Sequence, residues 1–241
     1  MIVTPLEDSL RIVTQADHAR FAAELLGLFR IDAVRLHPRR ALLLRAVAEH
    51  DNGWWEFDAA PAPDADGMPP DFRSIGEADR CEIWRRGVAR HATSEPAVAA
   101  LVATHALRLL GGKESGGPGR SEFLAELEER RDGFAREGGL DAAEIGSLDR
   151  WMELADALAL AAALGSASPV VRDELQAEVR ESDGRIHLAL SPLPLAGATR
   201  LILACRRIAR RHYDSAADLG GALATARWEG VTVLVGPPGR A

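Results

Sequence analysis

The stretch AVAEHDNGWWEFD, residues 46–58, decides how the helical part of this chain is interpreted. An apolar run that begins near Pro38 ends at the adjacent pair His50 and Asp51, and Gly53 follows. Proline suits the first turn of a helix, and glycine permits a helix to stop. We therefore predict a helix from about residue 38 to the His-Asp pair. An irregular loop rich in Pro, Asp and aromatic residues should follow, and such loops often bind ligands.

Further helices are predicted on both sides of this stretch. Thr14 is a good N-cap for the segment QADHARFAAELLGLF, and Asp141 with Glu144 forms a capping-box pattern. A Gly-rich break at residues 111–119 separates two helical segments. From about residue 176 the pattern alternates as in strands, and an Asp-Gly pair predicts a hairpin. The chain thus divides into a helical body, residues 14–165, and a small mixed β region, residues 1–13 and 176–241, packed on it.

Composition restricts the class of protein. The 241 residues are 47% hydrophobic, which supports a full core, and the net charge is −7. Without a basic stripe, nucleic-acid binding is not expected. Cys81 and Cys205 are too few for a disulfide framework, and neither a signal peptide nor a membrane span is recognised. We expect a soluble cytoplasmic protein whose partner is a small-molecule substrate, with no nucleic acid and no membrane; a homodimer is left open.

Six residues on five predicted helical segments carry the candidate chemistry. Imidazole and carboxylate side chains are ligands for borderline divalent metals, and a helical bundle can direct them inward. An aspartate in the apolar run 154–164 is costly to bury unless it is paired or coordinated. The sequence therefore predicts a site for one or two divalent ions (Fe, Mn, Zn or Mg), with the candidate ligands His18, His50, Asp51, His91, His105 and Asp156.

Each of these residues also has an ordinary structural explanation. A single buried histidine such as His105 is more often a hydrogen-bonded core residue than a ligand. His50 could complement the negative end of its helix. Asp156 could pair with Arg150 or Arg172. The sequence leaves these alternatives open.

The order of the candidate ligands resembles the HD-domain superfamily. In that superfamily an early helix provides a histidine, a second helix ends in the His-Asp pair, and a later helix provides an aspartate. His18, the pair at 50–51 and Asp156 in LADALAL match this order. His91 and His105 match the two extra histidines of members with two metals. The resemblance implies a mainly α fold: an HD-like helical bundle with a small C-terminal α/β appendage, which the N-terminal hairpin could join.

A second resemblance covers nearly the whole chain. The segment QADH (15–18), the loop HDNGW (50–54) and the C-terminal β region are similar to an uncharacterised bacterial family. That family has no assigned activity that could be transferred.

Three functions are compatible with these patterns. The first is a metal-dependent hydrolase that acts on a small phosphorylated substrate, with water on the metal as nucleophile. Trp54, Trp55 and Arg73 would bind the substrate, although the tryptophans could instead pack into the core. The second is an HD-like di-iron oxygenase. The third is a protein that binds a ligand or partner without catalysis. No general base is identified.

Overall fold

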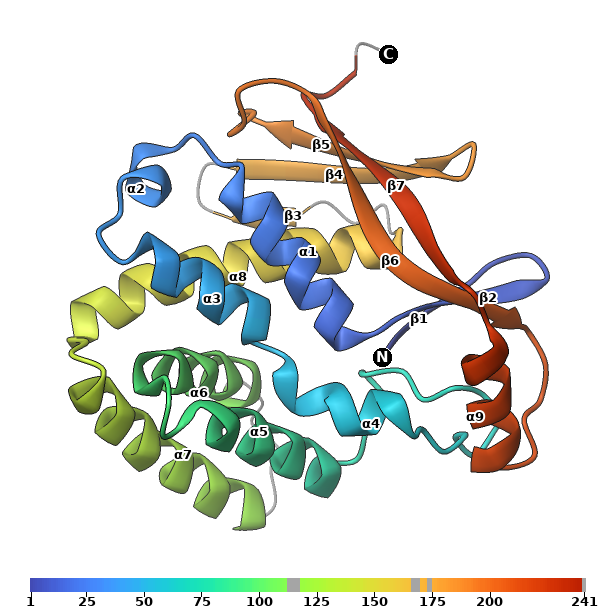
Figure 1. The fold of residues 1–241 in the computed structure, drawn as a ribbon, viewed down its shortest axis with the longest axis horizontal. Helices are drawn as coiled ribbons and strands as arrows, with labels where there is room; N and C mark the ends of the chain where they lie inside the picture. The colour runs from blue at the N-terminus through green and yellow to red at the C-terminus, as the bar shows by residue number, and fades with distance from the viewer. Residues whose placement is uncertain (112–117, 166–169, 173–174, 240–241) are drawn as a thin grey trace.

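The computed structural model describes residues 1–111, 118–165, 170–172 and 175–239. Its helices and strands form layers, with the sheet on one side and most helices on the other (Figure 1). The helices are α1 (Gln15–Gly27), α2 (Asp32–Arg35), α3 (Arg40–Glu49), α4 (Trp55–Ala59), α5 (Glu77–His91), α6 (Pro96–Gly111), α7 (Pro118–Glu137), α8 (Ala142–Leu164) and α9 (Ala216–Thr225), with a 3-10 turn η1 at Asn52–Trp54. The strands are β1 (Ile2–Pro5), β2 (Ser9–Val13), β3 (Val170–Arg172), β4 (Leu175–Ser182), β5 (Arg185–Ser191), β6 (Thr199–Ala209) and β7 (Trp228–Gly236).

The predicted local signals are present in the structure. The side chain of Thr14 accepts a hydrogen bond from the backbone of Asp17 and caps α1. Asp141 and Glu144 form a reciprocal capping box at the start of α8. Asp183 and Gly184, both with positive φ, make the tight turn between β4 and β5. The Gly-rich break predicted at 111–119 lies mostly outside the described residues.

All seven strands belong to one sheet in the order β1-β2-β6-β7-β5-β4-β3. Neighbouring strands are antiparallel except β5 and β7, which are parallel. The N-terminal hairpin joins this sheet, as expected, because β2 pairs with β6 through residues such as Leu10 and Ile208. Strand β6 therefore connects the two ends of the chain.

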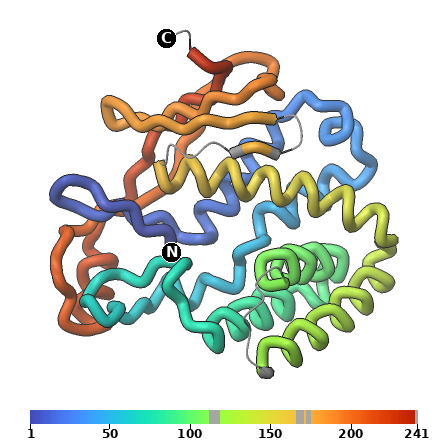
Figure 2. The backbone as a smooth tube through the Cα atoms, turned by 180° about the vertical axis from the view of Figure 1, so that it is seen from behind, coloured from blue at the N-terminus to red at the C-terminus, as the bar shows by residue number. Residues whose placement is uncertain are grey.

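The expectation of a mainly α, all-α bundle with a small appendage is wrong. On one face of the sheet, residues Leu188, Leu203 and Val233 share a single hydrophobic core with Leu25 of α1 and Leu158 of α8. Alternating strands bury one face only when another layer covers it, and here α1 and α8 are that layer (Figure 2). The protein is a mixed α and β structure in which the sheet is a full layer.

Three helices extend the structure away from the sheet. Helices α5, α6 and α7 pack beyond α3 and α8, on the side remote from the strands (Figures 1 and 2). Among the described residues, no helix is both long and apolar enough to span a bilayer. Five of the six candidate ligands of the sequence lie on α1, at the end of α3, on α6 and on α8.

Candidate metal centre

The loop after α3 is fixed against α5 by close backbone packing. Asn52 donates from Nδ2 to the carbonyl oxygens of Glu49 (2.7 Å) and Gly87 (3.2 Å). A Cβ atom on Gly53 would lie 2.0 Å from the backbone oxygen of Ile83, so only glycine permits this approach. The HDNGW sequence thus ends a helix and holds the end of that helix against α5. This contact sets the positions of the His-Asp pair.

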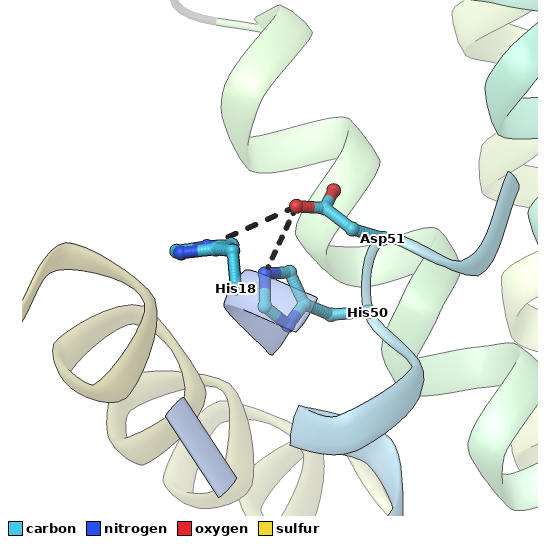
Figure 3. Close-up of side chains that lie close together, drawn as sticks. All are labelled: His18, His50 and Asp51. Carbon is cyan, nitrogen blue, oxygen red and sulfur yellow. Dashed lines mark ion pairs between the residues drawn. The ribbon is translucent and has the colours of Figure 1, made fainter. Parts of the chain in front are cut away.

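Five of the six candidate ligands come together in the structure. His18 lies on α1, His50 and Asp51 at the end of α3, His105 on α6 and Asp156 on α8. Their ligand atoms form two overlapping groups with all distances below 4.8 Å, namely His18, His50 and Asp51, and His50, His105 and Asp156. Figure 3 shows the first group, with the carboxylate of Asp51 directed at both imidazoles. We refer to these five residues as the His50 cluster.

The carboxylates face the imidazoles at short range. Nε2 of His18 lies 3.0 Å from Oδ1 of Asp156 and 3.9 Å from Oδ2 of Asp51. The three histidines and Asp51 are at most 5% exposed, and the side chain of Asp156 is 16% exposed. The structure therefore favours histidine partners for Asp156; the side chain of Arg172 lies outside the described part of the chain.

His50 has the geometry of a metal ligand. Its Nδ1 lies 2.7 Å from the carbonyl oxygen of Val47, and because a carbonyl can only accept, Nδ1 carries the hydrogen. Nε2 is then directed between Oδ2 of Asp51 (3.3 Å) and Oδ1 of Asp156 (3.5 Å), buried and without an aligned hydrogen bond. Metal-binding histidines commonly donate their other nitrogen to a backbone carbonyl in this way.

The electrostatics of the His50 cluster centre on two buried carboxylates. Burial alone would lower the pKa of His50, but Asp51 and Asp156 raise it well above its usual value. Burial opposes ionisation of the carboxyl groups, yet the histidines lower the pKa of Asp51 and hold that of Asp156 well below its usual range. Among the described residues, neither aspartate has a Lys or Arg within ion-pair distance. Two negative charges, beside imidazoles that can release a proton to a metal, fit a divalent cation.

His105 is in the cluster but has a different partner. Its ring meets that of His50 edge to face, with centroids 4.7 Å apart. Nη2 of Arg108 lies 2.8 Å from its Nδ1, and Nε of Arg108 lies 3.2 Å from Oδ2 of Asp149. Burial, followed by the charge on His50, lowers the pKa of His105 to about 3. The ring is therefore neutral at ordinary pH.

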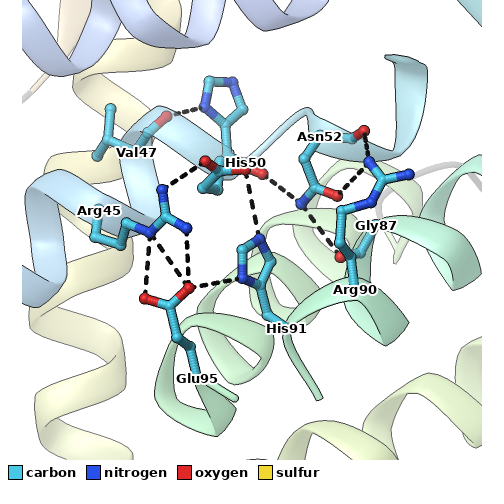
Figure 4. A network of polar contacts seen from close by, with 9 residues as sticks. Arg45, Val47, His50, Asn52, Gly87, Arg90, His91 and Glu95 are labelled. Atoms are coloured by element: carbon cyan, nitrogen blue, oxygen red, sulfur yellow. Dashed lines mark hydrogen bonds and ion pairs between the residues drawn. The ribbon is translucent and has the colours of Figure 1, made fainter. Parts of the chain in front are cut away.

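The structure does not bring His91 to the other five candidates. Its Nδ1 lies 3.1 Å from Glu95 and its Nε2 lies 3.4 Å from Glu49, while Arg45 contacts both glutamates (Figure 4). We refer to Arg45, Glu49, His91 and Glu95 as the His91 network. His91 is separated from the other candidates because its partner Glu49 points away from the His50 cluster. Glu49 and His50 are neighbours at one helix end, and successive helical side chains point in different directions.

The proposed substrate-binding residues lie at varied depths. Trp54 is 4% exposed and packs with Ile75 and Ile83, which is the core alternative left open by the sequence. Trp55 is 45% exposed and stacks on the guanidinium of Arg90. Arg73 pairs with its near neighbour Asp71 at 2.5 Å.

Sequence reasoning missed several residues that shape the site. Arg108 lies three positions after His105, the spacing of neighbours on a helix face, and this signal could have identified it. The roles of Glu49 and Asn52 had no comparable signal. A cavity of about 1180 Å³ lies elsewhere, over the face of the sheet turned away from α1 and α8, and none of the His50 cluster lines it.

The fold and the site together define a mixed α and β protein with a buried cluster of histidines and aspartates. The family described as "Protein of unknown function (DUF3891)" matches residues 1–196, a range that includes the whole cluster. The chain belongs to this family, which confirms the predicted resemblance to an uncharacterised family. Neither the curated proteins nor the solved structures contain a match to this chain. The likeness to the HD superfamily stays a prediction.

Proposed function

We propose that this protein is a metal-dependent hydrolase that acts on a small phosphorylated molecule. One observation carries the proposal: two buried carboxylates face Nε2 of His50, and no Lys or Arg among the described residues balances the carboxylates. Burying such charges without compensation is costly. A divalent cation would compensate both.

Four residues would hold the cation. Their facing atoms are Nε2 of His18, Nε2 of His50, Oδ2 of Asp51 and Oδ1 of Asp156. A bound divalent cation supplies an acidified water and polarises a phosphoryl oxygen. The order of these ligands along the chain is that of the HD superfamily, and this likeness supports hydrolysis of a phosphoester.

The protein residues also control access. His18 and His50 are almost completely buried, so bulk water is excluded from their side of the cluster. The side chain of Asp156 is the more exposed member, at 16%. We infer that the substrate approaches past α8.

No observation favours the di-iron oxygenase. A six-ligand centre would need His91, whose two nitrogens face glutamates of another network. If the metal is present but no substrate is hydrolysed, the protein is one that binds a ligand without catalysis.

The cytoplasm is the compartment we propose for this hydrolase. Cys81 and Cys205 are both free and buried, and burial raises the pKa of each thiol. Free thiols of this kind persist in a reducing compartment.

The test combines elemental analysis with a panel of small phosphomonoesters and phosphodiesters. Protein purified without added metal should contain a divalent transition metal and hydrolyse at least one substrate class. The double variant His50→Ala/Asp51→Ala should lose both metal and hydrolysis while circular dichroism shows helices retained. Full metal occupancy in the folded double variant would show that the assignment is wrong.

A further inference from the structure

Two histidines of the His50 cluster have opposite hydrogen bonds at the same ring atom. Nδ1 of His50 donates to the carbonyl oxygen of Val47 (2.7 Å). Nδ1 of His105 lies 2.8 Å from Nη2 of Arg108, and a guanidinium has only donors. Nδ1 of His105 must therefore be the acceptor.

This difference decides what each ring offers to the cluster. A neutral imidazole has one hydrogen, so the ring that accepts at Nδ1 carries its hydrogen on Nε2. A nitrogen that carries hydrogen has no lone pair for a cation. In the neutral form that a metal requires, His50 therefore presents a ligand atom at Nε2, whereas His105 presents an N–H donor there.

Arg108 is itself held in place by α8. Its Nε lies 3.2 Å from Oδ2 of Asp149, and Nη1 lies 4.0 Å from Oε1 of Glu153. The guanidinium side chain is 23% exposed, and Asp149 is half-buried on the helix that also carries Asp156. Arg108 thus connects the outer carboxylates of α8 to the ring of His105.

We propose that Arg108 is a positioning residue that fixes His105 as a neutral Nε2–H donor, and that His105 binds a phosphoryl oxygen of the substrate instead of a metal. A nitrogen of His105 lies within 4.8 Å of the ligand atoms of His50 and Asp156. Since Arg108 occupies Nδ1, Nε2 is the nitrogen left to contact a substrate. The substrate role rests on the proposed hydrolase; the position of the hydrogen does not. Four ligands then remain, enough for one cation.

The first arm of the test needs no activity. Long-range ¹H–¹⁵N spectra of metal-free protein labelled with ¹⁵N-histidine report which ring nitrogen carries hydrogen, and His50→Gln and His105→Gln spectra assign the signals. We expect hydrogen on Nε2 and not on Nδ1 of His105, whereas Nδ1 of His50 should carry hydrogen. Arg108→Met should remove the preference at His105, and Arg108→Lys, which keeps a donor, should restore it in part. Hydrogen on Nδ1 of His105 in the parent protein would overturn the proposal, and this result does not depend on whether Arg108→Met folds.

The second arm separates donor from ligand. His105→Phe keeps a ring but removes the donor, so it should retain one equivalent of Mn²⁺ or Zn²⁺ in a titration. Hydrolysis should fall by about 100-fold or more in kcat with a smaller change in KM, the scale seen when one donor to a developing charge is removed. Loss of metal in folded His105→Phe would make His105 a ligand and overturn the proposal. If the parent protein binds one metal but hydrolyses nothing, the proposed function fails while the spectra still test the hydrogen position.

Discussion

Two clusters of histidine and carboxylate side chains begin at adjacent residues of the chain. Glu49 points into the His91 network, and the next residue, His50, points into the His50 cluster. In the His91 network, Arg45 contacts both glutamates, at 2.7 Å and 2.9 Å, and so supplies a permanent positive charge. In the His50 cluster, the described contacts of Asp51 and Asp156 are with imidazoles.

This difference teaches how to distinguish a structural cluster from a candidate site. Both contain at least one buried histidine and two carboxylates, so these residue types alone do not separate them. The two clusters differ in whether an arginine is present. Glutamates that are already balanced by an arginine gain little from binding a metal. A pair of carboxylates balanced only by imidazoles can exchange the protons of those imidazoles for a metal ion.

The largest expected effect is on metal content. Asp156→Asn removes one charged ligand of the His50 cluster and should weaken metal binding by more than about 100-fold, since even changes behind the ligands cost about 10–100-fold. Glu95→Gln is the matched control in the His91 network and should keep its metal. Elemental analysis and a Zn²⁺ titration measure both. Equal metal content in the two variants would remove the distinction between the clusters.

The next effect tests the loop that joins the two clusters. Gly53→Ala places a Cβ 2.0 Å from the carbonyl oxygen of Ile83, so the turn must move away from α5. We expect a loss of about 3 kcal/mol in the free energy of unfolding, as for an overpacked core. Gly146→Ala on α8 is the control, because a Cβ there meets open space and alanine favours a helix by about 1 kcal/mol. Urea denaturation would contradict this if both variants gained stability.

A third substitution should destabilise the protein without affecting metal. His91→Leu leaves Glu49 and Glu95 with Arg45 as their shared partner, and His91 is 4% exposed. We expect a loss of about 1 kcal/mol, the net contribution of a typical hydrogen bond, because both glutamates keep Arg45. Metal content should equal that of the parent protein. Loss of metal in this variant would mean that the His91 network contributes to the site after all.

Local signals predicted the fold better than long-range packing did. The caps at Thr14 and Asp141 and the turn at Asp183 and Gly184 depend on neighbouring residues, and each is where the sequence placed it. Alternation in β4 to β7 indicated a buried face but could not say what covers it. That covering involves residues as distant as Leu25 and Val233, so the sheet was mistaken for an appendage.

In the candidate site, too, local signals were predictive and long-range contacts were not. Residue types and helical positions predicted that His18, the His-Asp pair and Asp156 could meet, and the structure brings them together. The direction of a side chain at a helix end changes by about 100° per residue, so His91 could not be excluded from its position alone. The hydrogen on His105 depends on the contact with Arg108, which only the structure supplies.

The last expected effect is the change in the free energy of unfolding per pH unit in the metal-free protein. His105 has its pKa lowered to about 3 by burial and by the charge of His50, against 6.5 in the unfolded chain. Between these values the unfolded chain binds a proton that the folded protein does not, so stability falls as the pH falls, by at most about 1.4 kcal/mol per unit. The raised pKa of His50 adds no slope there, because below pH 6.5 both states carry that proton, and the lowered pKa values of Asp51 and Asp156 act only below about 4. Urea denaturation with EDTA at pH 5.0 and 6.0 should therefore show a steeper loss for the parent protein than for His105→Phe, by about one proton. Parallel curves would show that His105 is not held neutral by the cluster.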